Sequence, residues 1–138
     1  MNMDTQIFIN LPVRDLPKSL NFFRALGFSH NPQFTDHTAA CVVISPTIHV
    51  MLLTEDKFCE FAPAAICDTE QANEALICLS CESREKVDAL VQLAVQAGGS
   101  SYAPAKDHGF MYQHGFQDPD KHVWELIYMA PCPGEAQP

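Results

Sequence analysis

One acidic residue, Glu125, stands inside an otherwise apolar run that follows the turn sequence Asp118-Pro119-Asp120. A carboxylate that points inward from an apolar strand needs a reason, because burying an unpaired charge is costly. Glu125 is therefore either a metal ligand or general base in a pocket, or the partner of a neighbouring polar group that only shapes the interior. We treat it as the candidate catalytic residue.

Composition limits the classes of partner. The chain of 138 residues has 17 acidic against 8 basic residues, a formal net charge of -9, and 47% hydrophobic residues. This length and composition predict one folded domain over residues 1–138. The negative charge and the lack of a Lys/Arg cluster argue against nucleic acid or an anionic membrane as a partner.

No apolar run approaches the roughly 18 residues of a membrane-spanning helix, and the first residues lack a signal-peptide pattern, so we expect a cytoplasmic protein. Its six cysteines lie mostly in apolar segments, which suits buried thiols in a reducing compartment. Cys78 and Cys81 have CxxC spacing, but in a strand residues three apart face opposite sides. The pair is thus a weak zinc signal.

The apolar patterns predict the same order of elements twice. In residues 5–54, a strand at 7–11 precedes a helix capped by Asp15 and ended by Gly27, and strands follow at 28–34, 39–44 and 49–54. In residues 74–129, a strand at 76–79 precedes a helix opened by Ser83, and strands follow near 101–103, 110–116 and 122–129. We therefore predict an α+β fold of two βαβββ modules whose curved mixed sheets enclose a cup. Residues 55–73 are expected to be an irregular linker and 130–138 a loose tail.

These features resemble the vicinal oxygen chelate superfamily, which includes glyoxalase I, bleomycin-resistance proteins and extradiol dioxygenases. The resemblance is carried by Leu11-Pro12-Val13-Arg14-Asp15-Leu16 running into Leu26-Gly27-Phe28, by Gly109-Phe110-Met111-Tyr112, and by Asp118-Pro119-Asp120 before Trp124-Glu125-Leu126. The chain is most similar to the bacterial glyoxalase-like subgroup. Lys121 stands where the family usually has Gly, which indicates a different turn type there.

Metal-dependent members take four ligands from the first and last strands of each module. The resemblance places Phe8, Leu52 and a position near Leu76 at three of these sites, and only Glu125 matches. A lone carboxylate does not hold a transition ion, because such sites need three or four donors. We therefore expect no metal cofactor, with a divalent ion such as nickel, zinc or iron as the alternative.

A register shift of one residue would change this assignment, because it exchanges the two faces of a strand. It would turn His49 or Met51 inward in place of Leu52. His49, His114 and Glu125 would then be candidates for a displaced metal site, although a strand histidine such as His49 more often packs at an edge.

The favoured function is a small-molecule binding protein with an apolar cup and a few polar groups. The alternative is a metal-dependent lyase related to glyoxalase I, in which Glu125 is ligand or base; an extradiol dioxygenase is less favoured because it needs two histidines and a carboxylate on iron. Whether the chain is an enzyme stays open. Arg14 is the best placed base for an anionic ligand, and the resemblance implies a homodimer paired through strand edges. The residues expected to bind the small molecule are Phe8, Asn10, Leu52, Leu76, Tyr112 and His114.

Overall fold

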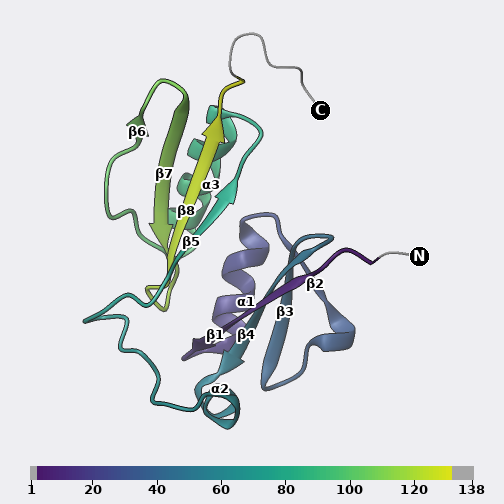
Figure 1. Ribbon diagram of the computed structural model, residues 1–138. Helices are drawn as coiled ribbons and strands as arrows, with labels where there is room; N and C mark the ends of the chain where they lie inside the picture. The colour runs from purple at the N-terminus through teal and green to yellow at the C-terminus, as the bar shows by residue number, and fades with distance from the viewer. Residues whose placement is uncertain (1–2, 132–138) are drawn as a thin grey trace. The chain divides into compact units, whose positions relative to one another are not determined.

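The computed structural model describes residues 3–131 and divides into two compact units, Met1–Asp68 and Thr69–Pro138. Each unit contains one βαβββ module, and each is described by itself (Figure 1). The predicted α+β fold with two mixed sheets is confirmed. Along residues 3–131, no helix has the length and apolar character needed to cross a membrane.

The first unit is built on a four-stranded sheet in the order β1-β4-β3-β2. Strand β1 runs parallel to β4, and the other neighbours are antiparallel. The elements are β1 (Ile7–Val13), α1 (Leu16–Ala25), β2 (Ser29–Asn31), the 3-10 helix η1 (Pro32–Phe34), β3 (Ala39–Ser45), β4 (Ile48–Thr54) and α2 (Glu55–Phe61).

Helix α1 begins and ends where the sequence predicts. The side chain of Asp15 accepts a hydrogen bond from the Lys18 amide at 3.1 Å, which satisfies one free N–H of the first turn. Gly27 ends the helix with a φ of 101°, a conformation that a residue with a Cβ adopts at a cost. Phe22 and Phe23 on α1 are almost fully buried.

The pleat gives this sheet two different faces. Val50 and Leu52 of β4 are fully buried on the side that α1 covers, beside their β3 partners Val42 and Ala40. The opposite side carries Phe8, whose ring stacks on its β4 neighbour at a centroid distance of 4.5 Å. One side is thus core, whereas the other side is exposed at Phe8 but buried at Cys41 and Leu53, and α2 contacts β1 and β4.

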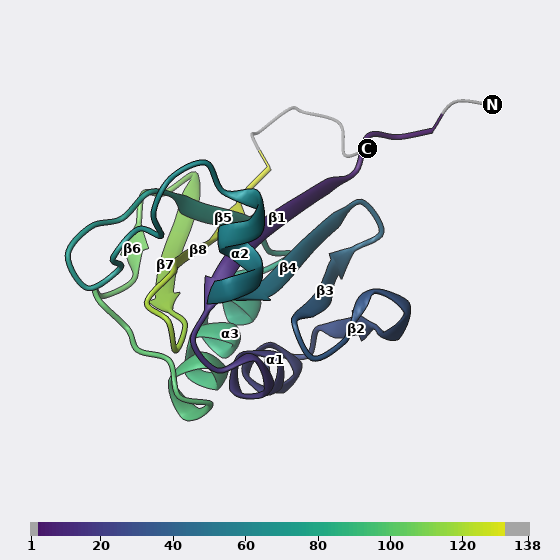
Figure 2. The ribbon, with the colours of Figure 1, turned by 90° about the horizontal axis from the view of Figure 1, so that it is seen from below.

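The second unit repeats this plan with a sheet in the order β5-β8-β7-β6, in which β5 runs parallel to β8 (Figures 1 and 2). The Ser83 side chain caps the helix by accepting from the Lys86 amide at 3.0 Å. The elements are β5 (Leu76–Ser80), α3 (Arg84–Gln96), β6 (Lys106–Asp107), β7 (Met111–Gln117) and β8 (Val123–Met129).

Three local expectations were wrong. The expected irregular linker at 55–73 contains helix α2, which begins at a Thr54 cap and has Glu55 and Asp56 in its first turn. The expected strand at 28–34 ends at Asn31 because Pro32 starts η1. The weak strand expected at 101–103 lies instead at 106–107, and only Ser100 forms an isolated bridge before it. Most of the expected tail, 132–138, lies outside the described residues.

Candidate functional site

Glu125 lies on the face of the second sheet that α3 does not cover. It pairs with Cys78 on β5 and with Gly115 on β7, so these three residues share one side of the pleat. The Gln113 side-chain amide, two residues along β7, donates to Glu125 Oε2 at 2.7 Å. Glu125 therefore has the neighbouring polar partner that one of its two interpretations requires, and this contact uses one of its two carboxylate oxygens.

The turn before β8 fixes the position of Glu125. Asp118 is 3% exposed and accepts from the backbone amides of Asp120 at 2.9 Å and His122 at 3.0 Å, while its other oxygen accepts from Trp124 Nε1 at 3.1 Å. Burial raises the pKa of this carboxyl, and the hydrogen bonds from Trp124 and His122 oppose that shift. The buried acid thus ties the turn to the first large side chain of β8.

A shallow pocket of about 60 Å³ opens beside Glu125. Gln113 and Glu125 form one wall, and Lys106, which pairs with Gln113 across the β6–β7 ladder, shares their face. Tyr102, in the loop before β6, lies against the sheet at Gly115, where any Cβ would overlap its hydroxyl. Gly115 therefore allows the phenol to approach the sheet next to Glu125. The pocket is lined by Tyr102, Ala103, Pro104, Lys106, Gln113, His114, Gly115 and Glu125.

The charge of Glu125 acts on its neighbours. Partial burial raises the pKa of the Tyr102 phenol, and the nearby Glu125 carboxylate raises it further. The same two causes, in the same order, raise the pKa of the Cys78 thiol. Both groups are thus protonated at neutral pH, so that the pocket offers hydrogen-bond donors beside one carboxylate.

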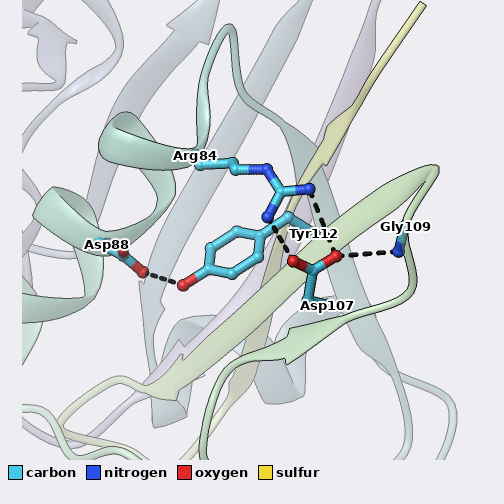
Figure 3. A network of polar contacts seen from close by, with 5 residues as sticks. All are labelled: Arg84, Asp88, Asp107, Gly109 and Tyr112. Atoms are coloured by element: carbon cyan, nitrogen blue, oxygen red, sulfur yellow. Dashed lines mark hydrogen bonds and ion pairs between the residues drawn. The ribbon is translucent and has the colours of Figure 1, made fainter.

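Tyr112 does not lie with Glu125, which corrects its expected place in the site, whereas His114 lines the same pocket as Glu125. Tyr112 donates to Asp88 of α3 at 2.7 Å and its ring lies under the Arg84 guanidinium, 5.1 Å from the centroid, on the helix-covered side (Figure 3). His114 lies two residues along β7 from Tyr112 and has the same strand parity. Its Nδ1 is 3.9 Å from the Asp88 carboxylate, and its Nε2 is 3.2 Å from the Ala103 carbonyl oxygen in the loop before β6. His114 therefore lines the pocket although its strand parity is that of Tyr112.

The residues expected in the first unit divide between the two faces. Phe8 is 48% exposed on the open face, and Asn10, two residues on, shares that face. Leu52 has no exposed surface and lies on the α1 side, so its expected place in the cup is corrected. His49 and Met51 take the open face instead, as the shifted register predicts.

Leu76, the last of the expected binding residues, is 59% exposed and shares its strand parity with Cys78 on β5. It therefore lies on the face of Glu125. Among the cysteines between residues 3 and 131, Cys41, Cys59, Cys78 and Cys81 are free thiols.

The donor set around Glu125 does not fit a transition metal. Over residues 3–131, no three His, Cys, Asp or Glu side chains come together as an ion would require. His114 and Glu125, two of the three candidates for a displaced metal site, have opposite strand parity in one sheet.

Four residues near Glu125 were not predicted from the sequence to lie in the site: Gln113, Gly115, Cys78 and Tyr102. The first three follow from the strand register once Gly115 is known to pair with Glu125. Tyr102 lies in a loop, whose path over the sheet no periodic pattern indicates.

Comparison with known proteins identifies the family. The model of the Glyoxalase/Bleomycin resistance protein/Dioxygenase superfamily matches residues 6–126. The chain belongs to this superfamily. A search of curated proteins finds no match.

Solved structures with the superfamily fold agree with this assignment. The hypothetical protein SA1046 from S. aureus is 28% identical, with a TM-score of 0.77 over 92% of this chain and 95% of that one. A glyoxalase/bleomycin resistance protein/dioxygenase family enzyme from Burkholderia phytofirmans is 16% identical, with a TM-score of 0.74 over 89% and 97%. A glyoxalase-related enzyme from Fulvimarina pelagi is 19% identical, with a TM-score of 0.75 over 91% and 88%. The latter two likenesses concern the fold alone.

Proposed function

We propose that the chain binds a small organic molecule on the Glu125 face of the second sheet, without a metal ion. The observation that carries the proposal is the hydrogen bond from Gln113 Nε2 to Glu125 Oε2 at 2.7 Å, which orients the carboxylate at the pocket. One oxygen is used in this contact. The other is available to accept from a ligand, since the Glu125 side chain accepts from Gln113 alone among residues 3–131.

The surface around Glu125 has the composition of a ligand site. Leu76, Ile127 and Met129 share its face through the β5–β8 and β7–β8 registers, and Leu76 and Met129 are 59% and 60% exposed. Apolar area supplies affinity, whereas a few polar groups fix orientation. Membership of the superfamily supports a small molecule as the ligand class.

The polar groups define what the ligand should carry. Glu125 accepts a hydrogen bond, Tyr102 donates one because its phenol stays protonated, and Lys106 adds a positive charge at the rim. A ligand that presents a donor group beside an acceptor group would satisfy both sides. In this proposal Glu125 binds the ligand through a proton and is not a metal ligand.

A metal-dependent lyase of the glyoxalase type remains the second candidate, and what favours it is the family alone. Glu125 would be the residue to move a proton next to a carbonyl. Among residues 3–131, no three His, Cys, Asp or Glu side chains lie close enough together to bind an ion, so this candidate is less favoured.

We also propose a cytoplasmic homodimer. The free thiols suit a reducing compartment. The sheets end in β1 and β2 in the first unit and in β5 and β6 in the second, and edges of this kind can pair with another chain. Light scattering after size-exclusion chromatography tests the dimer: a mass near 15.3 kDa would refute it.

The binding proposal is tested on protein stripped of metal by chelation. Fragments of metabolite size are screened by ¹⁵N NMR, with the amides of Gln113, Gly115 and Glu125 as reporters. Fragments that shift these amides should bind more weakly to Glu125→Gln, which keeps the side-chain shape. Their affinity should be unchanged in the control Glu60→Gln, at an exposed position. Hits that bind Glu125→Gln and the unmodified chain equally would contradict the proposal.

A further inference from the structure

A second and larger cavity lies in the first unit, apart from the Glu125 face. Its volume is about 280 Å³, and it is enclosed by the first half of α1 and by the segment that leads into β3. None of its residues belongs to the second unit. The lining residues are Leu16, Pro17, Leu20, Asn21, Thr35, Asp36, His37 and Ala40.

The inner wall of this cavity is apolar. Leu16 and Leu20 lie one turn apart on α1, and Ala40, with no exposed surface, supplies a small side chain on the facing strand. Because Ala40 pairs with the buried Leu52, the wall is continuous with the core under α1. An apolar cavity of about 150 Å³ accommodates benzene, so this one has room for a ring and a short chain.

The polar rim is held in place by its own hydrogen bonds. Asp36 Oδ1 accepts from the Thr38 amide at 2.7 Å, the Thr38 hydroxyl at 2.8 Å and the Ala39 amide at 3.0 Å. Thr35 Oγ1 donates to the Asn31 carbonyl at 2.7 Å and accepts from the Cys41 amide. A rim of this kind is preorganised, which lowers the cost of binding.

One carboxylate oxygen at the rim is left for a ligand. Within residues 3–131, all three hydrogen bonds that the Asp36 side chain accepts go to Oδ1, and those from Thr38 lower the pKa of this carboxyl, so it is ionised at neutral pH. Asn21 and His37 add further polar groups beside it. An apolar wall that ends at a fixed anionic group suits an amphipathic cation.

We infer that this cavity is a second binding site, for a single-ring compound that carries a primary ammonium group on a short chain. The ring lies against the accessible side chains of Pro17 and Leu20, since Ala40 has no exposed surface and Leu16 is almost fully buried. The ammonium group lies at the rim and donates to Asp36 Oδ2. This site requires neither Glu125 nor a metal ion.

The test is an NMR titration of the full chain with 2-phenylethylamine as the probe. The amides of Leu20, Asn21, His37 and Ala40 should shift with a common saturation curve. The anionic analogue 3-phenylpropionate should bind more weakly at the same amides. Shifts confined to the Glu125 face, equal binding of both probes, or no saturable shifts would overturn the inference.

Two variants locate the interaction. Asp36→Asn keeps Oδ1 as an acceptor for the rim and removes the charge, so the amine should bind about threefold more weakly, as expected for one exposed charge pair. Asn21→Trp, at an exposed helix position, should close the mouth and abolish binding, whereas Ala25→Trp on the same helix outside the cavity should leave it unchanged. Unchanged affinity in both Asp36→Asn and Asn21→Trp would refute the site.

Discussion

Replacing Gly115 by alanine tests the close approach that forms the pocket. The Cβ of alanine would lie 2.7 Å from the Trp124 carbonyl oxygen and 2.9 Å from Tyr102 Cζ, and nearer still to the Tyr102 hydroxyl. Distances under 3 Å require something to move. Tyr102 is 47% exposed and can swing out, but the Trp124 carbonyl belongs to the β7–β8 ladder.

We therefore expect Gly115→Ala to lower the free energy of unfolding by about 2 kcal/mol, within the range for overpacked sites. Urea denaturation followed by fluorescence measures it. In a Tyr102→Ala background the cost should fall by about 1 kcal/mol, because the contact with the phenol is gone while the carbonyl remains.

A matched control is Ser80→Thr, which adds one methyl group to the same sheet face at an exposed position of β5. It should change stability by less than about 0.5 kcal/mol. If Gly115→Ala behaves like this control, Tyr102 does not lie against the sheet at Gly115, and the pocket as described is wrong.

Three further results are expected. Asp118→Asn should cost about 1–3 kcal/mol in urea denaturation, because the amide oxygen that keeps the two backbone contacts leaves an NH2 facing Trp124 Nε1, and this group cannot accept. Burial raises the folded pKa of Asp118 above 3.8, so the stability that this shift contributes is present below pH 3.8 and is lost as the pH rises through the folded pKa. This pH dependence should vanish in the variant. Lys121→Gly should stabilise the chain by about 1 kcal/mol relative to Lys121→Ala, which loses the same exposed ion pair, because the φ of 65° favours glycine; equal stabilities would contradict this. Glu125→Gln should shift the alkylation profile of Cys78, read by mass spectrometry, to lower pH, because the carboxylate contributes to its raised pKa; an unmoved profile would place the two groups apart.

The helix ends and the family could be predicted because they depend on local residues. Asp15 and Ser83 cap helices by accepting from amides three residues on, and Gly27 ends α1, as their types indicate. These signals act within one turn of helix, so they can be recognised without knowing which strands pair.

The faces of the strands could be predicted only in part, because alternation fixes which residues lie together but not which side they take. Tyr112 and His114 do share a face, but the pairing of Gly115 with Glu125 puts that face under α3. In β4 the same one-residue ambiguity exchanged Leu52 for His49.

The remaining features of the site depend on contacts distant in sequence. Tyr102 reaches Gly115 from a loop, and Gln113 meets Glu125 across the β7–β8 ladder. The helix at Glu55–Phe61 begins at a Thr54 cap and lies in a segment whose composition is typical of a linker. No periodic pattern in the sequence indicates such contacts.

The most direct test of the central claim is ¹⁵N NMR of chelated protein with a fragment library, read at the amides of Gln113, Gly115 and Glu125. The account predicts saturable shifts at these amides without metal, and weaker binding in Glu125→Gln than in Glu60→Gln. If these amides respond only after nickel, zinc or iron is added in stoichiometric amount, metal-free binding at Glu125 is contradicted.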